Sequence, residues 1–303
     1  MIPQFPQFKS LELSDKEEIE NFTKKFHPYS DFNFVSMWCW NIGEGIFVSY
    51  LNKNLVVRFK DYITGKPFYS FLGDHKINDT AKILLDLSHK ENIDCTLKLV
   101  PEICAKGLDA SSFRIEEDQD NHDYIIPIIN LKPHDGRDRK LSSRRKLALK
   151  LRQMPDFSVQ VIDLHDPQIS EEILNVFFKW ESQREGDLNE IEHLKDSMQK
   201  IFKLNNIKNI ICIGTFIKNR LVGYSINEIL EDKYAIGHFQ QADSECFAGI
   251  YAVLMQETGI YLDELGLQYL NLEQDLGIEG LKKWKTSYGS ENFLKKYKVT
   301  LAG

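Results

Sequence analysis

The sequence repeats one order of predicted secondary-structure elements, and the second copy begins about 150 residues after the first. In the first copy we expect a strand at 8–13, helices at 14–26 and 31–41, strands at 45–50, 55–59 and 67–72, a helix at 77–89, a strand at 95–99, a short helix after Pro101, and strands at 113–116 and 124–129. In the second copy we expect a strand at 158–162, helices at 169–183 and 190–204, strands at 209–216, 221–229 and 234–240, a helix at 249–265, a strand at 268–270, a helix at 278–287 and a strand at 293–299. Such a repeat indicates duplication of one unit that contains both helices and strands.

The repeated plan is a strand, two helices, a three-strand meander, and then helix, strand, helix and strand. This is the plan of the acetyltransferase (GNAT) fold, so we predict an α/β (α+β) protein with two tandem GNAT-like (acyl-CoA N-acyltransferase) domains and mixed, mainly antiparallel sheets. The 303 residues suit two domains, which we place at 1–132 and 133–303, with the second opening on a basic helix at 137–153. A hydrophobic content of 42% is sufficient for a full core in each.

Composition argues against several classes of protein. A net charge of -7 opposes general coating of nucleic acid, which needs a basic surface. The five cysteines are scattered among mostly apolar neighbours, which predicts buried free thiols in a reducing compartment and no zinc site or other metal site. The N-terminus lacks the features of a signal peptide, and no apolar run is long enough to cross a bilayer. We therefore expect a cytoplasmic protein with no membrane span.

The stretch 132–152 is strongly basic although the chain as a whole is acidic. Leu141, Ala148 and Leu151 lie close to one face of a predicted helix, and the basic residues occupy the rest of its surface. These basic residues are Arg139, Lys140, Arg144, Arg145 and Lys146. One hypothesis is a solvated amphipathic helix. The other is a helix beside a groove between the domains, where each cation could meet one phosphate of a nucleic acid.

The segment 238–288 concentrates polar residues at the end of a predicted strand. Asn271, Glu273, Gln274 and Asp275 follow that strand, and a helix with three lysines begins near residue 278. Open sheets of this class bind ligands at such strand ends, so a polar site is one hypothesis. The other is that Asn271 and Asp275 only form turns. A second candidate cradle is the loop after Gln240, which leads into the next predicted helix.

The residues from Asn271 to Tyr288 contain the string N-x-E-Q-D-L-G-x-E-G-L-x-K-x-K-x-S-Y. This string resembles a family of uncharacterised bacterial proteins related to the C-terminal domain of phosphatidylglycerol lysyltransferases. The resemblance implies two acetyltransferase-type folds in tandem, as in the Fem aminoacyltransferases that use charged tRNA. It therefore implies a transferase, with an aminoacyl-tRNA donor and a small-molecule or peptide acceptor.

Aminoacyl transfer to an amine or hydroxyl needs a held donor, a hydrogen-bond donor to the oxyanion and a route for the acceptor's proton. We predict catalytic roles for Glu273, Asp275, Lys285 and Tyr288, with the two acids holding the ammonium group of the donor. The predicted substrate-binding residues are Asn271, Gln274, Gln240, Tyr251, Lys282 and Lys283. Tyr251 and Tyr288 are equally well explained as half-buried aromatic residues. His238 fits a satisfied core histidine better than a general base.

The alternative donor is an acyl-CoA, which this fold would bind at the loop 241–249. Asp243 and Glu245 lie where the pyrophosphate would approach, and each like-charge contact costs on the order of 1 kcal/mol or more. An acyl-CoA cofactor is thus possible but disfavoured. A third hypothesis, of another class, is a non-catalytic binding or regulatory protein with the same fold. The transferase hypothesis requires that the basic helix and the Asn271 loop face one common groove.

Overall fold

The computed structural model describes residues 1–61, 64–133, 139–183, 188–204, 209–290 and 292–302. The helices are α1 (Lys16–Thr23), α2 (Phe34–Trp40), α3 (Ile77–Lys90), α4 (Glu102–Ala105), α5 (Arg139–Arg152), α6 (Pro167–Glu181), α7 (Leu188–Ile201), α8 (Ile250–Glu264) and α9 (Glu279–Thr286). The strands are β1 (Lys9–Ser10), β2 (Phe47–Leu51), β3 (Asn54–Lys60), β4 (Pro67–Leu72), β5 (Leu97–Pro101), β6 (Phe113–Glu117), β7 (Asp123–Pro127), β8 (Phe157–Ile162), β9 (Ile210–Ile217), β10 (Arg220–Ile229), β11 (Tyr234–Ala242), β12 (Tyr269–Asn271), β13 (Asn292–Leu294) and β14 (Lys296–Leu301).

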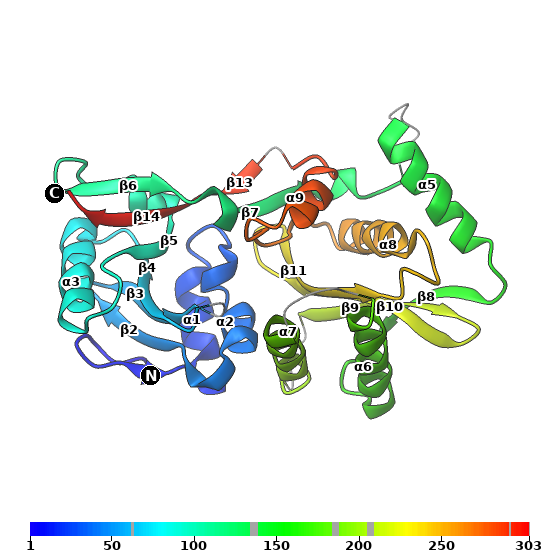
Figure 1. Ribbon diagram of the computed structural model, residues 1–303, viewed down its shortest axis with the longest axis horizontal. Coiled ribbons are helices and arrows are strands. Elements are labelled where there is room, and N and C mark those ends of the chain that lie inside the picture. The colour runs from blue at the N-terminus through cyan, green and yellow to red at the C-terminus, as the bar shows by residue number, and fades with distance from the viewer. Residues whose placement is uncertain (62–63, 134–138, 184–187, 205–208, 291, 303) are drawn as a thin grey trace.

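The strands form two series that lie end to end along the long axis of the molecule (Figure 1). The first series has the order β1-β2-β3-β4, and β4 lies beside β5, which continues as β5-β14-β6. The second is one sheet with the order β8-β9-β10-β11-β12-β7-β13. Among these described strands β11 and β12 pair in parallel, and the other hydrogen-bonded neighbours are antiparallel. The predicted mixed, mainly antiparallel sheets are therefore confirmed.

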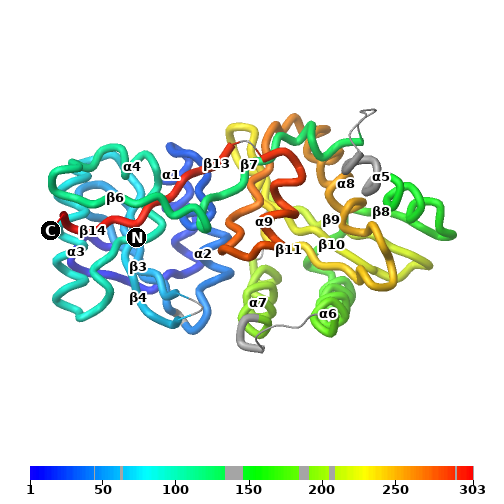
Figure 2. The backbone as a smooth tube through the Cα atoms, turned by 45° about the horizontal axis from the view of Figure 1, so that its top comes forward, coloured from blue at the N-terminus to red at the C-terminus, as the bar shows by residue number. Residues whose placement is uncertain are grey.

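Each series contains one strand from the other half of the chain. Strand β14, near the C-terminus, lies between β5 and β6, and β7, from the first half, lies between β12 and β13. Figure 2 shows the red C-terminal segment crossing to the blue and cyan half. The sequence predicted a single strand at 293–299. Instead the chain changes sheet at Lys295, because Leu294 packs into an apolar cluster while the ammonium group of Lys296 is bound by buried aspartates.

Helices cover both faces of the second sheet and join it to the first half. Helix α8 lies against one face, and α6 packs on the other (Figure 1). Helix α2, from the first half, packs against α7. The apolar clusters cross the same boundary, since Val35 and Cys39 of α2 pack with Phe177 and Tyr224 of the second half. The two halves consequently share part of their core.

The cysteines are free thiols, as expected, but not all of them are buried. Cys39, Cys104 and Cys212 are buried, whereas Cys95 and Cys246 are exposed. The prediction of burial is therefore wrong for those last two, because both lie in connections outside the strands and helices. Among the residues given a structure, we find no helix with the length and apolarity that a bilayer span requires.

Gly249 lies where α5 and α8 approach each other closely, and a substitution there tests the packing of these two helices. It precedes α8 with φ +95°, and a Cβ there would lie 2.6 Å from the Cβ of Leu147 and 2.8 Å from its backbone carbon. We expect Gly249→Ala to lower the free energy of unfolding by about 2–4 kcal/mol, because the left-handed backbone and the backbone clash both act against alanine.

Gly280 is the matched control for that variant, measured by urea denaturation. It has no atom within 4 Å of its ideal Cβ position and lies in α9. Gly280→Ala should leave stability unchanged or raise it by up to about 1 kcal/mol. Equal effects of the two substitutions would contradict the described α5–α8 contact.

Candidate functional site

The loop after β12 is a tight turn organised by Asn271. This residue is fully buried, and its Oδ1 accepts a hydrogen bond from the backbone N–H of Glu273 at 2.7 Å. Its Nδ2 donates to the carbonyl of Pro28 at 2.9 Å and to Asp123 at 3.2 Å. The turn places Glu273 at φ 57°. Asn271 therefore shapes the loop and ties it to the first half, and its predicted contact with substrate stays a prediction.

Asp275 also acts within the loop. It is 1% exposed, and its carboxylate accepts hydrogen bonds from the hydroxyl of Tyr124 and, at 2.8 Å, from the backbone N–H of Gly277. Burial, with a smaller effect of Asp275, raises the pKa of Tyr124 to about 12. In this structure the Asp275 carboxylate makes turn contacts, and its predicted role in holding the donor stays a prediction.

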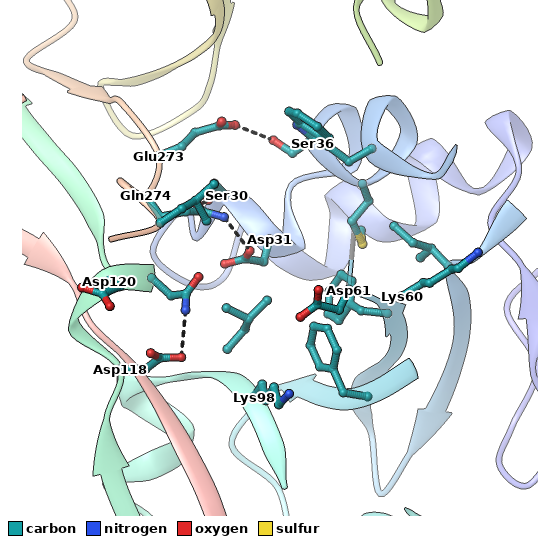
Figure 3. Close-up of a pocket in the computed structure, with 18 of the residues that line it drawn as sticks. Ser30, Asp31, Ser36, Lys60, Asp61, Lys98, Asp118, Asp120, Glu273 and Gln274 are labelled. Carbon is teal, nitrogen blue, oxygen red and sulfur yellow. Dashed lines mark hydrogen bonds between the residues drawn. The ribbon is translucent and has the colours of Figure 1, made fainter. Parts of the chain in front are cut away.

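Glu273 and Gln274 face a cavity of about 390 Å³ between the two halves (Figure 3). The sequence singled out these two residues, but apart from Leu276 of the same loop the rest of the wall comes from the first half and β14. The other lining residues are Ser30, Asp31, Ser36, Met37, Trp40, Ile46, Phe59, Lys60, Asp61, Phe68, Lys98, Leu99, Asp118, Asp120, Asn121, Leu276 and Lys298. The lining contains five carboxylates and three ammonium groups above an apolar floor. Its excess of negative charge suits a cationic ligand with an apolar part.

A buried ion cluster lies beneath this cavity. The ammonium of Lys296, 0% exposed, contacts Asp31 and lies 2.7 Å from Asp123. The backbone N–H and the hydroxyl of Ser30 donate to Asp123 at 2.8 and 2.7 Å, and that hydroxyl also lies 3.0 Å from Gln274 Oε1. One ammonium thus serves two buried carboxylates. Burial, opposed by Lys296, raises the pKa of Asp31 to about 6.

The sequence analysis missed Asp31, Asp123 and Lys296. They lie in three distant segments, and each fits an ordinary solvent-exposed position in its local pattern. Lys296 belongs to a strand with alternating lysines, and only its pairing between β5 and β6 directs the side chain inward. No local signal could have identified this cluster.

Lys285 is buried directly behind the cavity loop. Its ammonium donates to the backbone carbonyl of Gln274 and lies 5.8 Å from the centre of the Tyr124 ring. Burial lowers the pKa of Lys285 to about 8, although Glu273 and other acids oppose this effect. Lys285 thus contacts the loop that holds Glu273, and its predicted catalytic role stays a prediction. By contrast, Lys282 and Lys283 are exposed on α9, and Lys283 pairs with Glu279 at 3.0 Å.

The remaining predicted residues of the second half do not line this cavity. Tyr288 is 7% exposed and packs edge-on against Trp284, with 5.6 Å between ring centres. Tyr251 is partly buried in two apolar clusters, and Gln240 lies 3.4 Å from the sulfur of Met255. Both tyrosines pack against apolar or aromatic neighbours, and their predicted roles in catalysis and substrate binding stay predictions.

The basic helix lies away from the cavity. Ala148 and Leu151 of α5 pack in an apolar cluster with α8, which places α5 at the opposite end of the molecule from β1–β4 (Figures 1 and 2). Lys146 is exposed, whereas the side chains of Arg139, Lys140, Arg144 and Arg145 lie outside the described residues. No described residue of α5 lines the cavity. The expected common groove for the basic helix and the Asn271 loop is therefore wrong for this cavity.

His238 connects the cavity loop to the second sheet. Its two ring nitrogens lie 3.1 Å from Glu228 and 3.6 Å from Glu273, and its side chain is 2% exposed. The expectation of a satisfied core histidine is thus confirmed. Within the described parts of the chain, no cluster of three or more histidine, cysteine or acidic residues is suited to a metal ion.

Comparison with known proteins places this architecture in a family. The family described as "Phosphatidylglycerol lysyltransferase, C-terminal" matches residues 23–300. No curated protein sequence matches the chain.

Three solved structures share the fold over nearly their whole length. A conserved protein of unknown function from Bacteroides thetaiotaomicron is 24% identical with a TM-score of 0.79, and the match covers 100% of each chain. L-PGS from Bacillus licheniformis is 12% identical with a TM-score of 0.62, over 99% of this chain and 93% of that one. FemX is 12% identical with a TM-score of 0.56, over 98% and 97%. These likenesses establish a mixed α+β fold of the L-PGS and FemX type. Because the family match covers nearly the whole sequence, the chain belongs to the family of the phosphatidylglycerol lysyltransferase C-terminal domain.

Proposed function

We propose that this protein is an acyltransferase that moves an aminoacyl group from charged tRNA to an amine or hydroxyl acceptor. Its family and its likeness to L-PGS and FemX support acyl transfer. The observation that carries the aminoacyl assignment is the acid-rich cavity, where Asp31 and Glu273 line one wall. An aminoacyl group differs from a simple acyl group by its ammonium, and buried carboxylates are the groups that bind an ammonium most strongly.

We also propose that the chain consists of two tandem acetyltransferase-type units. The two strand series have the same order, with β14 and β7 at equivalent positions. A boundary near residues 132/133 then separates the two units along the sequence. In the folded protein each unit also contains one strand from the other half of the chain. The cavity lies between the units, where neither copy alone would supply all of its walls.

The loop before α8 gives a specific reason to favour tRNA over acyl-CoA. Asp243 is 9% exposed, and its carboxylate accepts hydrogen bonds from Gln183 Nε2 at 2.7 Å and from the backbone N–H of Cys246 at 3.2 Å. A pyrophosphate at this loop would meet a fixed negative charge, and one N–H that could bind it is already used. Because α5 lies away from the cavity, the proposal no longer depends on a groove shared by the basic helix and the Asn271 loop. A role of the basic helix in binding tRNA stays a prediction.

The donor is tested by incubating the protein with tRNA charged with radiolabelled amino acids and a pool of candidate acceptors. We expect label to move from tRNA into an RNase-resistant product. Parallel reactions with labelled acetyl-CoA should give no product. Transfer from acetyl-CoA with none from charged tRNA would overturn the proposal, and no transfer from either donor would favour the binding-protein alternative.

A further inference from the structure

A buried row of three ionisable side chains runs from the second sheet to the cavity wall. Glu228 lies on β10, His238 on β11 and Glu273 on the loop after β12. Glu228 and His238 are 0% and 2% exposed, whereas Glu273 is 19% exposed and lines the cavity. The row therefore has one end in the core and the other end at the place where a ligand would bind.

Each ring nitrogen of His238 faces a carboxylate. Nε2 lies 3.1 Å from Glu228 Oε2, and Nδ1 lies 3.6 Å from Glu273 Oε1 and 3.4 Å from the hydroxyl of Ser36. A neutral imidazole has one N–H and could donate toward one of the two acids. An imidazolium has an N–H at both positions and can direct one toward each acid. Burial alone would lower the pKa of His238, but hydrogen bonds to Glu228 and Glu273 outweigh it and raise the pKa to about 9.

The inner carboxylate is fixed independently of His238. The side-chain amides of Asn33 and Asn209 donate to Glu228 at 2.8 and 3.1 Å. The outer carboxylate accepts a hydrogen bond from the hydroxyl of Ser36 at 3.2 Å. A cation between two neighbouring carboxylates reduces the repulsion between them. An imidazolium at His238 lies between the two carboxylates and offsets one of their two negative charges.

We propose that His238 is the positioning residue of the cavity, and that its imidazolium orients the Glu273 carboxylate toward the ammonium group of the ligand. This rests on the proposed aminoacyl function, which supplies the ammonium. Lys285, Asp123 and Lys296 also act electrostatically on Glu273 or Asp31, but their own contacts lie outside the row of Glu228, His238 and Glu273. The role goes beyond packing because it fixes the charge of the wall and not only its shape.

Charge-matched variants distinguish a role of His238 in setting the charge of the wall from a role in packing alone. His238→Gln leaves two buried carboxylates without their cation, whereas His238→Gln with Glu228→Gln restores the single negative charge of the row. The probe is L-alaninamide, a monocation, with N-acetyl-L-alaninamide as its neutral counterpart, and binding is measured by calorimetry at pH 7. We expect His238→Gln to weaken L-alaninamide binding at least tenfold and the double variant to return it to within about threefold of wild type. Neither change should affect the neutral probe.

The result that overturns the inference is wild-type affinity in His238→Gln, or a folded double variant that stays as weak as the single one. NMR of the His238 ring nitrogens gives a reading that does not depend on any ligand. We expect both nitrogens to be protonated at pH 7 in the wild type, and the protonated fraction to fall in Glu228→Gln. Failure of L-alaninamide to bind the wild type would count against the proposed function, whereas a neutral ring in the wild type would refute the role of His238.

Discussion

Replacing Lys296 with methionine is expected to lower the free energy of unfolding by about 3–5 kcal/mol, because it leaves two buried acids without their cation. Lys296 is completely buried and contacts both Asp31 and Asp123. Methionine keeps most of the side-chain volume, so the loss comes from charge and not from a cavity. Urea denaturation at pH 7 measures it. The difference in unfolding free energy between wild type and variant should be smaller at pH 5, because carboxylates left without a cation take up protons there.

The neighbouring lysine provides the control. Lys295 pairs with Glu117 at 3.0 Å, but its side chain is 41% exposed. Lys295→Met should cost no more than about 1 kcal/mol, because exposed ion pairs contribute little. If both substitutions had the same small effect, the buried ion cluster would have no part in stability.

Replacing Asp31 with asparagine is expected to reduce kcat/KM for aminoacyl transfer on the order of 10- to 100-fold. Asparagine preserves the shape of the side chain but removes the charge that would face the ammonium of the donor, and a hydrogen bond to a charged group contributes about 1.5–3 kcal/mol. Asp61→Asn is the matched control at the same cavity. Its carboxylate accepts a hydrogen bond from the backbone N–H of Thr64 at 2.8 Å, and we expect a change within about threefold.

The pH dependence of the reaction distinguishes a charge effect from a change of shape. The pKa of Asp31 is raised to about 6, so this carboxyl is protonated below that pH and ionised above it. Binding of the cationic donor should therefore strengthen as the pH rises through about 6, and this step should disappear in Asp31→Asn. A wild-type profile without the step would remove Asp31 from the binding site.

Local patterns predicted the elements well because each helix and strand has a regular spacing of apolar residues. The helix at 77–89 and the strand at 67–72, for example, correspond closely to α3 and β4. The same patterns could not reveal where distant elements meet. An amphipathic spacing indicated that α5 has an apolar face, but not that this face covers α8 at the far end of the molecule.

The candidate site was partly predictable for a similar reason. The density of polar residues after β12 correctly drew attention to Glu273 and Gln274, which line the cavity. The same density drew in Asn271 and Asp275, whose side chains form the turn that holds the other two. Asp31 and Lys296 were missed because their burial depends on the pairing of β14 in the first half.

The position of β14 has a consequence for how the protein is made. This strand emerges from the ribosome after every other strand, yet it lies in the middle of the series that was synthesised first. The early strands β5 and β6 must wait, with their facing edges uncovered, until β14 has been synthesised. Folding of the first half is thereby linked to synthesis of β14, and a nascent chain stalled before Lys296 should be a substrate for chaperones.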